Sequence, residues 1–336
     1  QAAQLGGGEN LPASTPDQLS ASLNSAISRI REVNDSFSSP SVASNNVDQT
    51  RSRDAIYFAM FYPETNTRWG GNLKKLKVSG SQIIDSTGAN ALDSNGLIDT
   101  DAKTFWLPSG QSADGNLVAQ GGVNYHLSSL TGSDLENRRK IYTDKQGGIV
   151  RFTSSIVNEV LDLVPDNSIL LSDSDIKWTM GIDVDDEDSD NSTTDQRQNI
   201  FGDPLHSKPV ALDYGNNDIR ILIGTNAGFL HMFKDDDVNN TVSESWAFIP
   251  SELYDIIKPL RTKETGKKYG MDGPISVYFN NKSLNSDGLN DGIIDASGDD
   301  KVWAFAGMRR GGENYYALDI TNPDEPKKLW DNPIEG

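Results

Sequence analysis

Residues 208–335 contain an internal repeat, which constrains the fold more than any other feature of the sequence. Its first copy, residues 209–248, and its second copy, residues 274–330, each hold four strand-like segments separated by turn residues. Each copy therefore predicts a four-stranded unit, with Trp246 and Trp330 in equivalent fourth strands. Four-stranded units that follow one another along a chain are typical of β-propeller blades, and a β-sandwich is the alternative.

The sequence before the repeat is also rich in strand-like segments. Within residues 51–200 these segments occur at 56–62, 74–78, 83–85, 141–143 and 149–152, and a short helix is expected at about 155–163. We interpret this region as one or more divergent blades with insertions, followed by two blades in residues 201–336. The predicted fold class is therefore mainly β, a modified β-propeller-like fold with four-stranded blades of the quinoprotein type and a mixed insertion region.

The first 50 residues have a different pattern. Thr15 and Pro16 form a helix start, and Leu19, Leu23, Ile27 and Ile30 follow at helical spacing. This pattern predicts an amphipathic helix to about Val33 that packs on a partner outside the β-region, and residues 34–50 are expected to be a linker. We interpret residues 1–50 as the trailing end of a preceding domain.

The composition excludes several classes of function. The chain has 49 acidic against 30 basic residues and a formal charge of −19, which disfavours a nucleic-acid partner. It has no cysteine, so a disulfide framework, a thiolate metal site and a thiol nucleophile are excluded. No apolar run approaches the roughly 20 residues that span a membrane. An exported protein whose signal peptide was removed or lies upstream is consistent with these features.

The second copy of the repeat carries about 18 additional residues between its first two strands, and they contain the most specific chemical signal. Against a calcium-loop template, Asp287 falls at position 1, Gly292 at the sharp turn and Asp295 at position 9. Leu289 replaces the usual oxygen ligand at position 3. The expected Ca²⁺ ligands are Asp287, Asn290, Asp291, Ile293 through its carbonyl, and Asp295. A flexible acidic hairpin is the alternative.

A second acidic cluster lies at residues 183–190 and fits several registers. So many carboxylates would repel one another, so either a bound cation or disorder is expected. Asp183, Asp185 and Glu187 are the candidate ligands of a second metal. His206 and His231 are expected to be structural residues, and no nucleophile, base and orienting acid come together in the sequence.

Several motifs resemble the PilC/PilY family of type IV pilus assembly proteins and tip adhesins. The resembling segments include residues 69–74, 202–209, 224–233, 246–250 and 315–321. The resemblance implies a seven-bladed modified propeller, a von Willebrand A-like domain before it, and calcium held by an Asp-rich loop, here Asp287, Asp291, Ile293 and Asp295. Of that preceding domain, only the trailing helix is expected in this sequence.

The resemblance implies a non-enzymatic function. We expect a calcium-dependent adhesin and assembly factor at the type IV pilus tip, with roles in pilus biogenesis, attachment and twitching motility. Pilins or minor pilins are the expected partners, and the location is the cell surface or pilus tip of a Gram-negative bacterium. A quinoprotein dehydrogenase-like enzyme and a structural subunit of an extracellular filament are the alternatives.

Overall fold

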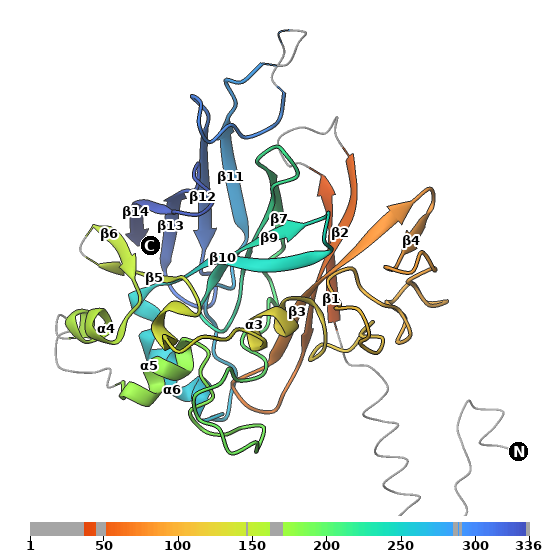
Figure 1. Cartoon of the computed structure of the whole chain (residues 1–336). Helices are drawn as coiled ribbons and strands as arrows, with labels where there is room; N and C mark the ends of the chain where they lie inside the picture. The colour runs from red at the N-terminus through yellow and green to blue at the C-terminus, as the bar shows by residue number, and fades with distance from the viewer. Residues whose placement is uncertain are drawn as a thin grey trace, which may run out of the picture. The chain divides into compact units, whose positions relative to one another are not determined.

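Three β-sheets organise the described part of the chain (Figure 1). The computed structural model describes residues 37–44, 52–145, 147–161, 171–284, 288 and 291–333. The first sheet is antiparallel, with the strands β1 (Phe37–Ser44), β2 (Ser52–Tyr62), β3 (Gly70–Ser79) and β4 (Gln82–Ile84) in that order. The three strands expected between residues 56 and 85 are therefore confirmed.

The two copies of the repeat form two further sheets. The first copy supplies β7 (Val210–Asp213), β8 (Ile219–Gly224), β9 (Leu230–Asp236) and β10 (Thr241–Ile249). The second supplies β11 (Ile275–Asn280), β12 (Lys301–Gly307), β13 (Asn314–Asp319) and β14 (Lys327–Pro333). Each set is an antiparallel meander. Trp246 lies in β10 and Trp330 in β14, so the prediction of equivalent fourth strands is confirmed.

The sheet of the first copy is larger than the sequence predicted. The hairpin of β5 (Ile141–Lys145) and β6 (Gly148–Arg151) joins it, because β5 pairs in parallel with β10. The sheet therefore has six strands in the order β6-β5-β10-β9-β8-β7 and takes strands from both sides of residue 200. Among the described residues, none of the three sheets closes on itself, so the structure shows a mainly-β fold of open sheets.

The linker expected at residues 34–50 is partly wrong. Residues 37–44 form β1, an edge strand that pairs with β2, and Pro40 is opposite Phe58. An edge strand tolerates proline and needs no apolar alternation, because hydrogen bonds to a single neighbour define it. The helix expected at about 16–33 lies outside the described residues.

The three sheets pack face to face in chain order. Ala55, Tyr57 and Leu73 of the first sheet pack against Ile221 and Ile223 of the second. The opposite face of the second sheet packs against the third, through the residues Leu222, Met232, Trp246, Ala304, Ala306 and Leu318. All six residues of β8 are buried, as expected for a strand covered on both faces. Figure 1 shows this order from β1–β4 (orange) to β11–β14 (blue).

Short helices fill the connections: α3 (Gly122–Ser128), η1 (Leu135–Asn137), α4 (Ser154–Leu161), α5 (Asp173–Thr179), η3 (Ser251–Leu253) and α6 (Tyr254–Arg261). The helix expected at about 155–163 is α4. A capping box in which Ser172 and Asp175 bond to each other's backbone N–H begins α5. Across the described ranges, none of the helices has the length and apolar character to cross a membrane.

Candidate functional site

The loop between β11 and β12 holds the predicted calcium ligands. Asp287 and Asn290 lie outside the described residues. Asp291 Oδ1 accepts the backbone N–H of Ile293 at 2.9 Å, and Asp295 Oδ1 accepts those of Ser297 at 2.9 Å and Gly298 at 3.0 Å. The described part of the loop thus presents Asp291 and Asp295 from two successive turns, and calcium ligation by this loop stays a prediction.

Asp300, which the sequence reasoning missed, organises this loop. Its buried carboxylate accepts the backbone N–H groups of Lys282 (2.7 Å), Ser283 (3.1 Å) and Asp295 (2.8 Å). Burial acts to raise the pKa of Asp300, but these hydrogen bonds hold the pKa below its usual value. Asp300 therefore ties the two ends of the loop together through its carboxylate. The one feature of the sequence that pointed to Asp300 is its position directly before β12.

The buried Ile294 fixes the middle of the same loop. Its side chain belongs to the core between the second and third sheets, and its backbone N–H donates to the carbonyl of Asp213 at 2.8 Å. Asp213 ends β7, so the loop of the second copy rests on the first copy. Asp291 and Asp295 are consequently presented from a loop held by both copies of the repeat.

In the second acidic cluster, the three predicted ligands have protein partners. Asp183 accepts the backbone N–H of Glu187 with both carboxylate oxygens, at 3.0 and 2.9 Å. Asp185 pairs with Arg261 at 2.7 Å, and Glu187 forms a two-pronged pair with Arg68 at 2.8 and 2.5 Å. Burial opposes the ionisation of Glu187, but Arg68 lowers its pKa to about 2. All three carboxylates thus contact protein groups, and metal binding by Asp183, Asp185 and Glu187 stays a prediction.

The carboxylates that do converge in this segment are Asp186, Asp188 and Asp190. One oxygen from each lies within 4.8 Å of the others, and these are the only three acidic or metal-ligating side chains grouped in this way in the described ranges. Desolvation and the nearby negative charges, Asp190 first among them, raise the pKa of Asp188. Three hard oxygen donors suit a divalent cation such as Ca²⁺ or Mg²⁺.

The backbone explains why alternate residues converge here. Asp186, Ser189 and Asn191 have positive φ angles of 51°, 62° and 68°, so the segment winds through tight turns. The spacing Asp-x-Asp-x-Asp was visible in the sequence. The sequence did not show which carboxylates converge, because the arginines that pair with Asp185 and Glu187 are 76 and 119 residues away in the chain.

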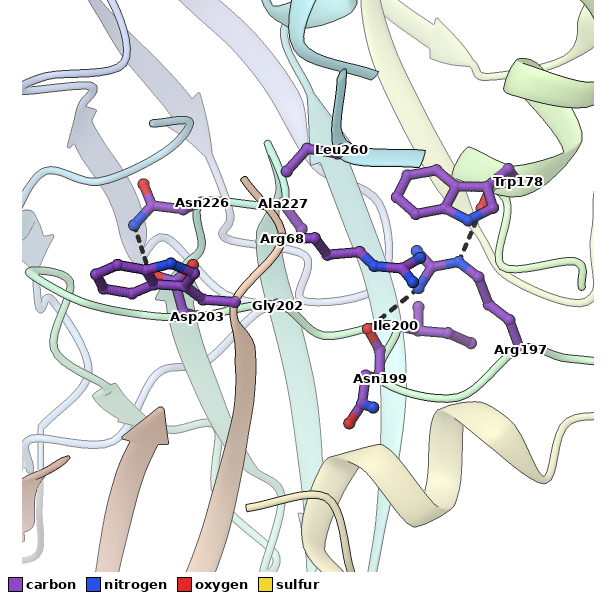
Figure 2. Close-up of a pocket in the computed structure, with 11 residues that line it drawn as sticks. Arg68, Trp178, Arg197, Asn199, Ile200, Gly202, Asp203, Asn226, Ala227 and Leu260 are labelled. Carbon is purple, nitrogen blue, oxygen red and sulfur yellow. Dashed lines mark hydrogen bonds between the residues drawn. The ribbon is translucent and has the colours of Figure 1, made fainter. Parts of the chain in front are cut away.

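Arg68, Arg197 and Trp178 lie together in the lining of one pocket (Figure 2). The buried guanidinium of Arg197 lies 3.9 Å from the ring centre of Trp178 and donates to the carbonyls of Trp178 and Asn199 at 3.2 and 3.1 Å. Arg68 also lies over Trp178, at 5.4 Å. Burial lowers the pKa of Arg197 well below its usual value. Both arginines therefore pack on Trp178, and Arg68 also pairs with Glu187.

The histidines are engaged separately. Nδ1 of His206 lies 2.7 Å from Asp272, and Nδ1 of the buried His231 lies 2.8 Å from Glu244. Burial lowers the pKa of His231. Glu244 also accepts two hydrogen bonds from Arg139, at 2.7 and 2.8 Å. The structural roles expected for His206 and His231 stay predictions.

Stacked open sheets with acidic turns define a mainly-β protein, and comparison with known proteins shows which proteins the chain is similar to. The chain is 26% identical, across 96% of its length, to the type IV pilus biogenesis factor PilY1 of Pseudomonas aeruginosa strain UCBPP-PA14. It is 24% identical, across 98% of its length, to the protein of the same name from strain PAK. These similarities support the resemblance to the PilC/PilY family that the motifs predicted.

The matches cover nearly all of this chain but only part of each relative. The chain spans about a quarter of the length of the curated relatives it matches. No family model and no solved structure matches the chain.

Proposed function

We propose that this chain is a β-sheet module of a type IV pilus biogenesis factor and that it acts by binding rather than by catalysis. One observation carries the proposal: relatives named as type IV pilus biogenesis factors match nearly the whole chain. Pilins or minor pilins are the proposed partners, the location is the cell surface or pilus tip, and attachment and twitching motility are the proposed roles.

The proposed architecture is a β-propeller. Two observations support it: the two copies form four-stranded meanders, and these meanders stack face to face. Both are properties of propeller blades. In this arrangement the loops at the ends of the blades are available to partners, while the strands hold them in place.

Calcium is the proposed cofactor. Its proposed positions are the loop from Asp287 to Asp295 and the cluster of Asp186, Asp188 and Asp190. The converging carboxylate oxygens of that cluster support the proposal, because oxygen donors are what Ca²⁺ prefers. Bound Ca²⁺ would neutralise the repulsion among these carboxylates and so stiffen the loops that meet the partner.

Deletion of the gene in the source bacterium tests the proposed function. Type IV pili at the cell surface and twitching motility are expected to be lost and to return when the gene is restored. Immunogold labelling is expected at pilus tips, whereas labelling along the shaft would indicate a filament subunit. Normal piliation of the deletion strain would contradict the proposal. An absorbance change of the purified protein with added quinone would instead favour the enzyme alternative.

A further inference from the structure

A compact group of cations lies at one end of the third sheet of this acidic protein. Residues 266–272, shortly before β11, and residues 308–312, directly after β12, carry four basic residues against one acidic residue, in a chain with a formal charge of −19. The four basic residues are Lys267, Lys268, Arg309 and Arg310, and they define what we call the basic surface. All of them except Lys267 are exposed.

The two segments touch each other, so their cations form one surface. A side chain at Gly311 would overlap the carbonyl group of Gly270, and the absence of side chains at these two positions lets the segments lie side by side. The Arg310 guanidinium donates to the Tyr269 hydroxyl at 3.0 Å and lies 5.3 Å from the centre of the Tyr269 ring. Tyr269 therefore joins the first segment to the arginines of the second.

Buried acidic residues hold the basic surface from beneath. The carboxylate of the buried Asp272 lies 3.7 Å from the Arg309 guanidinium, and Lys267 pairs with the buried Asp203. The side-chain amide of Asn226 donates to Asp203 and Asp272, at 2.7 and 3.1 Å. One hydrogen-bonded network thus underlies both segments. Cations held in this way lose little side-chain freedom when a partner binds, which favours binding.

The backbone of Arg309 is a second sign that this surface binds a ligand. Arg309 has a φ angle of 53°, in the left-handed region that glycine adopts freely and that other residues adopt at a cost. Residues in such conformations cluster at ligand-binding sites. His206, whose side chain is 31% exposed, lies beside Arg309, because its Nδ1 atom is 2.7 Å from the same Asp272 carboxylate.

We infer that the basic surface is a docking site for an acidic segment of a partner protein, whose Asp and Glu carboxylates pair with Lys268, Arg309 and Arg310. The planar guanidinium of arginine matches a carboxylate in a two-pronged pair. The inference rests on the binding role in the proposed function and adds the surface and the chemistry of the partner to it.

The basic surface and the proposed calcium loop lie at opposite ends of the third sheet. The loop with Asp291 and Asp295 joins the end of β11 to the start of β12, whereas the basic surface adjoins the start of β11 and the end of β12. Docking at the basic surface is therefore independent of calcium at that loop.

The distribution of charge favours a short acidic segment over an extended polyanion. Three exposed cations form the surface, but acidic residues exceed basic residues by 19 in the whole chain (49 against 30). A membrane, a nucleic acid or a sulfated polysaccharide extends beyond the surface and would meet that negative charge. A second copy of the chain would bring a further charge of −19. A short run of Asp or Glu residues meets only the cations.

Binding of a fluorescein-labelled hexaglutamate peptide tests the inference, with fluorescence anisotropy as the readout. Binding to the parent is expected to weaken from about 0.01 M to about 0.15 M NaCl, because the Debye length falls from about 30 Å to about 8 Å. Arg309→Gln/Arg310→Gln is expected to weaken it about tenfold, through the loss of two ion pairs. Lys301→Gln/Lys327→Gln is the matched control, because it removes two exposed charges at the other end of the third sheet.

Failure of hexaglutamate to bind the parent, or equal weakening by the two double variants, would overturn the inference. Tighter binding of heparin or of phosphatidylglycerol vesicles than of hexaglutamate, through the same two arginines, would also overturn it, because an extended polyanion would then be the ligand. Parent dimers in sedimentation that Arg309→Gln/Arg310→Gln lacks would indicate a second copy instead.

Circular dichroism of both double variants is expected to match that of the parent, because all four substituted side chains are exposed. The peptide assay uses only the purified chain, and piliation of a deletion strain has no bearing on it. Failure of this inference and failure of the proposed function are therefore distinguishable.

Discussion

At the scale of single residues, buried charges are satisfied by specific partners. The ammonium of Lys74 is fully buried and donates to the carbonyls of Asp114, Gly115 and Leu117 at 2.5, 3.0 and 2.9 Å. The Asp114 carboxylate lies 3.3 Å away. Burial outweighs this pairing and lowers the pKa of Lys74 to about 8. Lys74 thus binds the loop at 114–117 to β3, and it loses its proton at a lower pH than an exposed lysine does.

The lowered pKa of Lys74 makes the stability of the protein depend on pH. Between pH 8 and 10.5 the unfolded chain holds this proton while the folded chain releases it, so the free energy of unfolding rises with pH. The gain is up to about 3 kcal/mol, since each pKa unit is about 1.4 kcal/mol. Urea unfolding across this pH range is expected to show a rise for the parent that Lys74→Met lacks. Lys301→Met, on an exposed lysine, should keep it.

The sequence predicted where the acidic segments lie but not the contacts of each residue. The Asp-rich composition predicted a calcium loop at 287–295 and either a bound cation or disorder at 183–190, because carboxylates this close repel one another. The sequence did not indicate which of Asp183, Asp185 and Glu187 would face protein groups. Arg68 pairs with Glu187 and Arg261 pairs with Asp185, and only folding brings these arginines near. Sequence spacing alone does not carry that information.

At the scale of elements, local pattern predicted the strands of the repeat but not the hairpin added to it. β8, β9 and β10 were visible as β-branched and aromatic runs between turn residues. The pairing of β5 with β10 is parallel and joins residues about 100 positions apart, as Ile141 is opposite Ala247. Such pairing leaves no periodicity in either strand, so it could not be predicted.

The carboxylate of Asp144 secures the β5–β6 hairpin to the segment after β10. It accepts the backbone N–H of Ser251 at 2.6 Å and the Ser251 hydroxyl at 3.1 Å, at the start of η3. Loss of a carboxylate that caps a helical turn costs about 1–2 kcal/mol. We expect Asp144→Ala to lower the free energy of unfolding by this amount in urea unfolding, and Asp144→Asn by less.

Lys145→Ala is the matched control for Asp144→Ala. Lys145 pairs with Glu159 at the surface, so its removal is expected to cost less than about 0.5 kcal/mol. Equal losses for the two alanine variants would show that the hairpin contributes through its strands and not through Asp144.

At the scale of the whole molecule, stacked apolar sheets coexist with a large negative charge. The charge of −19 opposes the compact state by self-repulsion, whereas the apolar residues buried at the two sheet interfaces favour it. Cations can relieve this repulsion in two ways: by general screening or by binding at the acidic loops. The two differ in their dependence on ion type, because screening responds to ionic strength alone.

Thermal unfolding in matched salts separates these two effects. Raising NaCl should increase Tm, and CaCl₂ at equal ionic strength should increase it further if a loop binds the ion. For a dissociation constant of ~10⁻³ M, 10 mM Ca²⁺ adds about 1.4 kcal/mol, or roughly 2 °C. Asp186→Asn/Asp190→Asn removes this extra gain if that cluster is the site, and Asp291→Asn/Asp295→Asn removes it if the β11–β12 loop is. Glu313→Gln, which removes an exposed charge elsewhere, should keep both responses. A Ca²⁺ response equal to that of NaCl in the parent would show that neither loop binds calcium at this affinity and that the ion acts only by screening.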